Sequence, residues 1–378
     1  MKLFYSKDYV ASAEAFDTTR KAGWIARSLR SDPVEGVELC EPHPLNYDDL
    51  MEVHRPEYVD ALLTGKPYWL AGSSGFAWDK DTWRRVCSSN GGVVDACHVA
   101  MRDGVAGSLS SGLHHAGRSG GGGFCTLNGL ALGARAALNA GARRVLIVDF
   151  DAHCGGGTES MLKPGMKMVD VSTSQFDNYK SSGDARLRVV EATPRCVAKW
   201  TRNNRPGLIG DRYLMTCKFA LAEVTGDVDL VIYNAGMDPF ELCDIGGRWG
   251  ISYEVLEARE RMVFEWAAER GDPVACVLAG GYTGRRLSEG DLVLLHRLTI
   301  EAAARSQRRN DGDDDRGGEI VVPQVRVGLD DVRPVDAGAG RGVPSVREGK
   351  RPDGLGELEP VPPYLPGRVG KGGTSITR

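Results

Sequence analysis

The sequence predicts an α/β protein built on a mostly parallel β-sheet that is flanked by helices. Short runs rich in Val, Ile and Leu alternate with longer segments of helical character, the order expected of strands joined by crossover helices. The runs are apolar throughout, as in strands that are buried on both faces. Four of these segments end in glycine beside a chemically useful side chain, at the edge where open α/β sheets carry their sites.

The individual elements follow from this alternation. The β-prone segments predict strands at Lys2–Tyr5, Val105–Leu109, Val145–Asp149, Met168–Ser172, Val228–Tyr233 and Val274–Ala279. The segments between them predict helices at Leu50–Leu63, Asp81–Met101, Thr126–Asn139, Asp211–Val224, Tyr253–Arg270 and Glu289–Ser306.

The composition divides the chain after Ser306. With 378 residues, 42% of them hydrophobic, the chain can bury a full core, in one large α/β domain or two smaller domains, and we place this folded part over residues 1–306. Residues 307–378 are rich in Gly, Pro, Arg and Asp, and they bury too little apolar area to offset the entropy of ordering them. We expect this tail to be mainly disordered, with Ile320–Val327 its only strand-like segment; docking of the tail on the domain is the alternative.

Composition also excludes several classes of partner. The net charge is only −4 and no Lys/Arg-rich run lies near the motifs, so nucleic-acid binding is not expected. No stretch approaches the roughly 20 apolar residues of a membrane span, and the start of the chain lacks the apolar core of a signal peptide. The nine cysteines are scattered singly without a Cys-X-X-Cys pair, which favours free thiols and a cytoplasmic location. The sequence does not specify an oligomeric state.

The most informative segment runs from Asp149 to Thr158, where an apolar strand ends in two carboxylates and an imidazole and then continues into glycines. Residues two apart on a strand point to the same side, so Asp149, Asp151 and His153 are expected to converge. The competing interpretation is a strand end whose acids cap the next helix. Repetition of the layout favours a site, since His114-His115, Gly236-Met237-Asp238 and Gly280-Gly281-Tyr282 lie in comparable places.

Asp151, His153 and Asp238 supply one nitrogen and two carboxylates, a set that suits Zn²⁺ and also accepts Fe²⁺ or Co²⁺. Three protein ligands leave one coordination position open, as in catalytic rather than structural sites. Such an ion lowers the pKa of bound water to about 7 and polarises a carbonyl. The pattern therefore indicates a mononuclear catalytic centre.

Other side chains suit proton transfer and charge stabilisation. His114 and His115 fit general base and general acid roles, and Asp149 is placed to orient one imidazole. Tyr282 offers a phenolic donor for an oxyanion. Taken singly, two loop histidines and a tyrosine packed at a turn are simpler interpretations, and only the neighbouring motifs favour catalysis.

In this order, the motifs resemble those of the zinc-dependent histone deacetylase family, which includes acetylpolyamine amidohydrolases and acetoin-utilisation proteins. The resemblance covers roughly residues 1–306 and implies the three-layer arginase/deacetylase-type fold, a parallel sheet between helices. It rests on Glu57-Tyr58, Asp81-Thr82, His114-His115-Ala116, Gly123-Phe124-Cys125, the segment from Asp149 to Thr158, Gly236-Met237-Asp238, Asp244-Ile245-Gly246-Gly247 and Gly280-Gly281-Tyr282.

The resemblance also implies a role for each site residue: zinc binding, proton transfer, oxyanion stabilisation, an acyl-lysine tunnel and a monovalent cation such as K⁺. The residues in these roles would be Asp151, His153 and Asp238 for zinc, His114 (paired with Asp149) and His115 for protons, Tyr282 for the oxyanion, Gly123 and Phe124 for the tunnel, and Ser172 for the monovalent cation. The related arginases bind two manganese ions with extra aspartates. Gly155, Asn234 and Gly236 stand where further acids would be needed here, which favours a single ion.

Two positions depart from the family pattern. Cys154 stands where a second histidine usually follows the zinc ligand, and Gly156 stands where the family usually has Asp or Asn. Because that acid or amide supports the second active-site histidine, His115 is expected to lose its usual partner, leaving water or another side chain to replace it. We then expect turnover to be slower by up to roughly 100-fold, and Gly156→Asn to raise kcat.

The predicted function is that of a zinc-dependent amide hydrolase, a deacetylase that removes an acetyl or small acyl group from an amine, with acetyl-lysine in protein as the expected substrate. An acetylated polyamine or another small molecule is the alternative substrate, although no carboxylate for a distal amine is evident. A metal-binding protein of the same fold with weak or no catalysis is a different class. The departures at Cys154 and Gly156 favour it, but the retained His114, His115 and Tyr282 argue against it.

Overall fold

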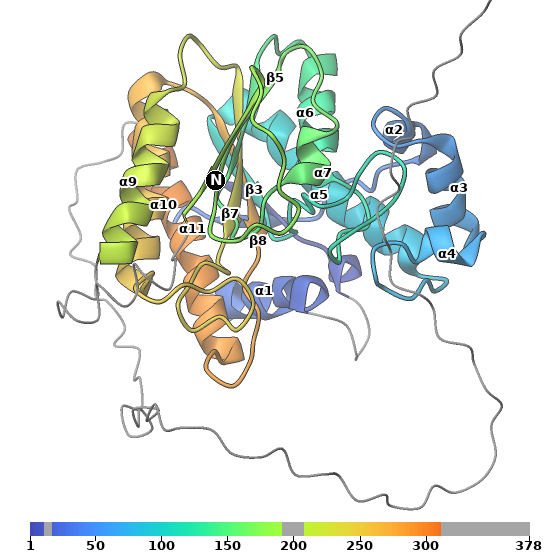
Figure 1. Cartoon of the computed structure of the whole chain (residues 1–378), viewed down its shortest axis with the longest axis horizontal. Coiled ribbons are helices and arrows are strands. Elements are labelled where there is room, and N and C mark those ends of the chain that lie inside the picture. Colours follow the sequence, from blue (N-terminus) through green and yellow to red (C-terminus); the bar gives the residue numbers. More distant parts are fainter. Residues whose placement is uncertain (11–16, 191–207, 311–378) are drawn as a thin grey trace, which may run out of the picture. The chain divides into compact units, whose positions relative to one another are not determined.

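The apolar strands form one eight-stranded sheet in which every neighbouring pair is parallel (Figure 1). The computed structural model describes residues 1–10, 17–190 and 208–310. The strands are β1 (Lys2–Phe4), β2 (Glu38–Cys40), β3 (Val105–Ser108), β4 (Val145–Asp149), β5 (Met166–Ser172), β6 (Ala185–Val189), β7 (Leu230–Gly236) and β8 (Val274–Ala279). Their order in the sheet is β2-β1-β3-β8-β7-β4-β5-β6. The predicted α/β class with a parallel sheet is confirmed.

Helices cover both faces of the sheet and complete three layers. In Figure 1, α9, α10 and α11 lie on one side of the strands, and α5, α6 and α7 on the other. The helices are α1 (Lys21–Ser31), α2 (Tyr47–Met51), α3 (Pro56–Thr64), α4 (Tyr68–Ala71), α5 (Thr82–Asp103), α6 (Gly129–Asn139), α7 (Gly156–Glu159), α9 (Leu208–Ala222), α10 (Tyr253–Arg270) and α11 (Glu289–Asn310). Short 3₁₀ turns occur at Lys7–Tyr9 and Asp17–Thr19.

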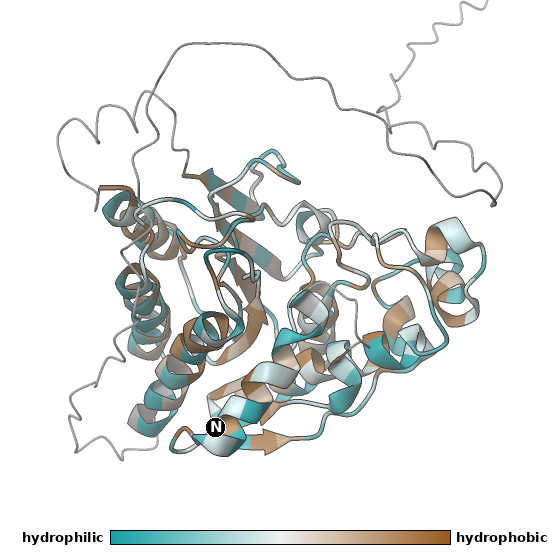
Figure 2. Ribbon diagram, turned by 90° about the horizontal axis from the view of Figure 1, so that it is seen from below, coloured by the Kyte–Doolittle hydropathy of each residue, from teal (hydrophilic) through white to brown (hydrophobic). Residues whose placement is uncertain are grey.

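The core lies in two layers because successive side chains of a strand point to opposite faces. In β4, Val145 and Ile147 pack with residues of α5 and α6, whereas Leu146 and Val148 pack with residues of α9, α10 and α11. Figure 2 shows the largely apolar strands between helices that carry both apolar and polar stretches. Since both faces are covered, the strands need apolar residues at every position, which is the pattern that predicted them.

The elements that the sequence pattern did not predict are short or lie at the sheet edges. β2 and β6 are the outer strands, and β6 carries Arg186 and Arg188 among its few apolar residues. The helix predicted at Leu50–Leu63 is two helices, α2 and α3, because Pro56 occupies the first position of α3 and has no N–H to continue the first helix. The missed α1 packs its Ile25 and Leu29 against the sheet and α11.

The last described helix, α11, continues beyond Ser306 to Asn310. The strand-like segment at Ile320–Val327 lies outside the described residues, as does the chain from 311 onward. Within the described ranges, no helix combines the length and the apolar character that a membrane crossing requires.

Candidate active site

Three predicted metal ligands meet at the carboxyl ends of two neighbouring strands. β4 ends at Asp149, so Asp151 and His153 follow directly, and Asp238 comes two residues after the end of β7. β4 and β7 are paired in parallel, which brings these ends to the same edge of the sheet. One nitrogen or oxygen of each of the three side chains lies within 4.8 Å of the corresponding atoms of the other two.

The donor set fits a divalent cation. The Oδ2 atom of Asp238 is buried without a hydrogen-bond partner, although the His153 Nδ1 atom lies 2.9 Å away. Burial, together with the charge of Asp151, raises the pKa of Asp238 to about 6. Two carboxylates held close together in a buried site are costly without a shared counter-charge, and a cation bound by both carboxylates and the imidazole removes that cost. This geometry matches the predicted ligand set.

The backbone at Gly280 packs directly against the carboxylates of Asp151 and Asp238. At Gly280, where φ is +50°, an added Cβ would lie 2.2 Å from the Asp238 Oδ1 atom and 2.7 Å from the Asp151 Oδ2 atom. Only glycine permits this approach. The carbonyl of Gly280 accepts a hydrogen bond from the buried ammonium of Lys21, whose pKa burial lowers to about 8. Sequence reasoning missed Lys21, because a lysine at the start of a helix carries no motif.

His114 is held by Asp149 as predicted from the motifs. Its Nδ1 atom lies 2.8 Å from Asp149 Oδ2, and the other carboxylate oxygen accepts a hydrogen bond from the Asn234 amide at 2.8 Å. Burial acts to lower the pKa of His114, but the charges of Asp149 and Asp151 outweigh it and raise the pKa to about 10. The imidazole is thereby fixed with its Nε2 atom facing His115 at 3.1 Å.

His115 has a carboxylate partner that the sequence did not reveal. Its Nδ1 atom lies 2.8 Å from the Oδ2 atom of Asp177, a residue of the loop after β5. Burial and the charge of His114 lower the pKa of His115, while the hydrogen bond to Asp177 opposes that shift. The usual partner is absent at Gly156, as the sequence showed, but another side chain replaces it, so the expectation of slowed turnover loses its basis.

Aromatic side chains and glycines surround the histidine pair. A Cβ at Gly123 would lie 2.5 Å from the Cδ2 atom of His115, so the chain passes directly against that ring. Phe124 follows with φ +60° and 41% exposure, and Phe176, 54% exposed, meets the His115 ring edge to face at 4.9 Å between centroids. Phe176 is a second apolar wall that the sequence analysis missed.

Tyr282 lies at the end of β8, beside the end of β7 that carries Asp238. Burial, followed by the charges of Asp238 and Asp151, raises the pKa of Tyr282 well above its ordinary value. The phenol is protonated at neutral pH and can donate a hydrogen bond.

Ser172 ends β5 and donates its hydroxyl hydrogen bond to Asp170 Oδ1 at 2.5 Å. Asp170 is fully buried, and it also accepts hydrogen bonds from Gly155 N and the Tyr179 hydroxyl. Burial and the nearby charge of Asp149 raise the pKa of Asp170 to about 8. A monovalent cation at Ser172 stays a prediction.

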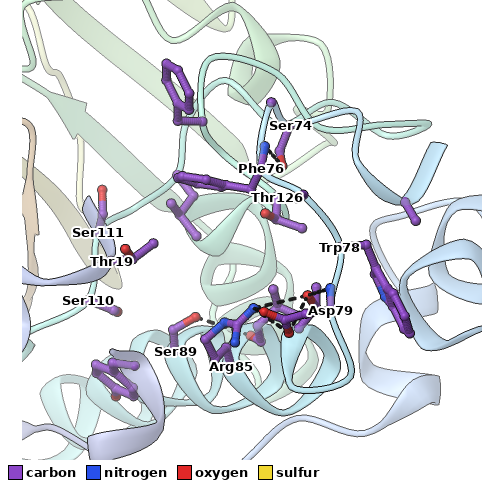
Figure 3. A pocket seen from close by; sticks show the side chains of 18 of the residues that line it. Thr19, Ser74, Phe76, Trp78, Asp79, Arg85, Ser89, Ser110, Ser111 and Thr126 are labelled. Carbon is purple, nitrogen blue, oxygen red and sulfur yellow. Dashed lines mark hydrogen bonds and ion pairs between the residues drawn. The ribbon is translucent and has the colours of Figure 1, made fainter. Parts of the chain in front are cut away.

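A cavity of about 620 Å³ is shown in Figure 3. Leu113, which precedes His114, and Phe124 belong to its lining. On its far side Asp79 and Arg85 form an ion pair at 2.8 Å, and Phe76 lies against Phe124 with 5.4 Å between ring centroids. The cavity thus places apolar surface next to the loop that carries both histidines.

Comparisons with known proteins identify the class. The family model described as the histone deacetylase domain matches residues 15–298. An uncharacterized protein of Picosynechococcus sp. is 33% identical over 282 residues, which cover 73% of this chain and 88% of that protein. Histone deacetylase 2 of Arabidopsis thaliana is 27% identical over 299 residues, 75% of this chain and 74% of its own length. A probable deacetylase of Methanothermobacter thermautotrophicus is also 27% identical, covering 73% of this chain and 83% of its own length.

The solved structures agree on the fold. The crystal structure of the HDA15 HD domain superposes with a TM-score of 0.61 at 19% identity and covers 83% of this chain and 94% of its own. The protein is therefore a hydrolase that acts on amides. More narrowly, the chain belongs to the histone deacetylase family, which confirms the resemblance and the arginase/deacetylase-type fold.

Proposed function

We propose that this protein is a zinc-dependent deacetylase that removes an acetyl or small acyl group from the side-chain amine of lysine in protein. The observation that carries the proposal is the convergence of Asp151, His153 and Asp238 beside the histidine pair. When bound, a Zn²⁺ ion supplies Lewis acidity, which polarises an amide carbonyl and makes water acidic enough to react near neutral pH. Fe²⁺ or Co²⁺ would suit the same ligands.

The proton transfers fall to the two histidines. In the proposed reaction a water oxygen bonds to the amide carbon, the C–N bond breaks, and a carboxylate and an amine leave. His115 and His114, in contact through their Nε2 atoms, accept the proton from water and return one to the departing nitrogen. Asp149 fixes His114 in this arrangement through its Nδ1 atom.

Tyr282 stabilises the charge that develops on the carbonyl oxygen. Its phenol is protonated at neutral pH, as that of an ordinary tyrosine is, so it can donate a hydrogen bond to an oxyanion. Gly123 and Phe124 form one side of the acyl-lysine tunnel in this proposal, and the exposed ring of Phe176 the other. The acylated amine is the only partner the proposal requires.

Metal content and hydrolysis test the proposal together. The purified full chain should contain one equivalent of metal and release acetate from a fluorogenic acetyl-lysine peptide, and a chelator should abolish that release until Zn²⁺ is restored. Asp238→Ala should lose both the metal and at least about 100-fold in kcat, while Asp227→Ala, an exposed surface control, should keep both. Metal-free wild-type protein, or an active Asp238→Ala variant, would overturn the proposal.

A substrate screen decides the finer assignment. Acetyl-lysine peptides should be hydrolysed with a higher kcat/KM than acetylpolyamines, because the described carboxylates nearest the histidine pair already bind its imidazoles or belong to the metal triad. The reverse preference would move the assignment to a small-molecule amidohydrolase.

The eight cysteines in the described part of the chain are free, which fits the predicted cytoplasmic location; the location stays a prediction.

A further inference from the structure

A general-base imidazole needs a fixed tautomer and a fixed orientation, and a hydrogen-bond acceptor at its second nitrogen provides both. His114 has that acceptor in Asp149, at 2.8 Å. His115 has an equally short contact, 2.8 Å, to Asp177. Asp177 comes from the loop after β5, 21 residues further along the chain than Gly156 (177 − 156), so the two positions belong to different segments.

Asp177 occupies the space that a side chain at position 156 would need. A Cβ on Gly156 would lie 2.5 Å from the Asp177 backbone oxygen, 2.6 Å from its Oδ1 atom and 2.9 Å from its Cγ atom. The absence of a side chain at Gly156 and the position of the Asp177 carboxylate are therefore two parts of one arrangement. A side chain at position 156 is therefore incompatible with the present position of Asp177.

The local backbone holds the Asp177 carboxylate against His115. Asp177 has φ +57°, a left-handed conformation that aspartate tolerates better than most residues. Its Oδ2 atom also accepts a hydrogen bond from Gly157 N, in the first turn of α7, at 3.1 Å. The preceding residue, Phe176, lies edge to face against the His115 ring. One turn of chain thus supplies both the acceptor for His115 and an apolar wall beside it.

We infer that Asp177 is the positioning residue of His115 and replaces, from the loop after β5, the acid or amide that the family usually carries at position 156. The carboxylate sets His115 with a proton on Nδ1, which makes its Nε2 atom, facing the His114 ring at 3.1 Å, a proton acceptor. This inference rests on the proposed deacetylase function for its effect on rate. Its structural part, the fixed tautomer of His115, does not depend on that function.

Kinetics of loop variants test the effect on rate. In the full-length protein, Asp177→Ala should lower kcat by about 10–100-fold with KM and metal content nearly unchanged. Asp177→Asn should recover most of kcat, because an amide oxygen still accepts the Nδ1 proton. The matched control is Asn178→Ala in the same loop, since Asn178 is exposed and its side-chain amide donates a hydrogen bond to the Gln175 side chain rather than to a site residue. Equal kcat in Asp177→Ala and wild type, or equal losses in the Ala and Asn variants, would overturn the inference.

NMR of the histidine ring provides a readout that does not need activity. The wild-type protein should show a downfield Nδ1–H resonance that disappears in His115→Gln; Asp177→Asn should retain it and Asp177→Ala should lose it. If the wild type fails to hydrolyse any acyl-lysine, the proposed function fails, and this resonance still decides whether Asp177 fixes His115. Persistence of the resonance in Asp177→Ala would refute the positioning role.

Discussion

At the scale of single residues, the site is arranged so that each imidazole has a carboxylate at one nitrogen and a neighbouring imidazole at the other. Asp149 serves His114 and Asp177 serves His115, both at 2.8 Å. The two acids come from different strand ends, β4 and β5, which are adjacent in the sheet. The parallel arrangement thus brings together side chains that are far apart in the sequence.

This packing reverses the effect expected for Gly156→Asn. From the sequence, an amide at position 156 should have raised kcat by supporting His115. In the structure, its Cβ would meet the backbone and carboxylate of Asp177 at 2.5–2.6 Å, so we now expect Gly156→Asn to displace Asp177 and lower kcat by at least about 10-fold. A single Gly156→Asn variant as fast as the wild type would contradict this packing argument.

The sequence predicted most of the site because its residues lie in continuous motifs at strand ends. Asp151, His153 and Asp238 follow two apolar strands directly, and paired parallel strands must bring their carboxyl ends together. Asp177 and Phe176 could not be found in this way. They lie in an irregular loop without periodicity, and only the folded chain shows that the loop returns to His115.

At the scale of elements, one buried ion pair joins the helical layer to the strand ends. Arg259 of α10 is fully buried; it pairs with Glu260 at 2.6 Å and donates hydrogen bonds to the Phe150 carbonyl just after β4 and to the Tyr213 hydroxyl of α9. Tyr233 of β7 donates to Glu260 at 2.7 Å. The pair of Arg259 and Glu260 thus contacts the end of β4 and the middle of β7, the two strands that precede the metal ligands.

Loss of Arg259 should destabilise the fold more than an ordinary surface change. Arg259→Met removes the charge and leaves Glu260 buried and unpaired, for which we expect a loss of about 3–5 kcal/mol in the free energy of unfolding. Urea unfolding followed by tryptophan fluorescence measures this loss. Arg261→Met, an exposed arginine on the same helix, serves as the control and should change stability by less than about 0.5 kcal/mol. Equal unfolding midpoints for the two variants would show that the buried pair does not stabilise the sheet.

The central elements were predictable and the edge elements were not, for a physical reason. β4, β7 and β8 are covered on both faces, so their residues are apolar up to Asp149 in β4 and Asn234 in β7, and the pattern is easy to recognise. The edge strand β6 has a partner on one side only and tolerates Arg186 and Arg188, which form ion pairs with Glu223. Its sequence therefore lacks the continuous apolar run of a buried strand.

At the scale of the whole molecule, the C-terminal turn of α11 connects the last helix to the start of β3. The Gln307 side chain accepts a hydrogen bond from Val105 N at 2.8 Å and donates one to the Asp103 carbonyl at 3.0 Å. Arg308 donates to the Glu35 carbonyl at 2.9 Å. These contacts lie just beyond Ser306, where the composition of the sequence placed the end of the catalytic domain.

The position of this turn predicts how far the chain can be shortened. A chain of residues 1–310 keeps the whole of α11, and we expect it to retain the hydrolytic activity and the unfolding midpoint of the full protein. A chain of residues 1–306 removes the bonds of Gln307 to Val105 and Asp103 and leaves the Val105 N–H without its acceptor, so its free energy of unfolding should fall by about 1–3 kcal/mol. Gln307→Ala in the full chain separates this contact from the loss of helix length and should account for a large share of the decrease. If residues 1–306 were as stable as residues 1–310, the domain would end at Ser306 as the composition suggested, and the Gln307 contacts would contribute nothing measurable.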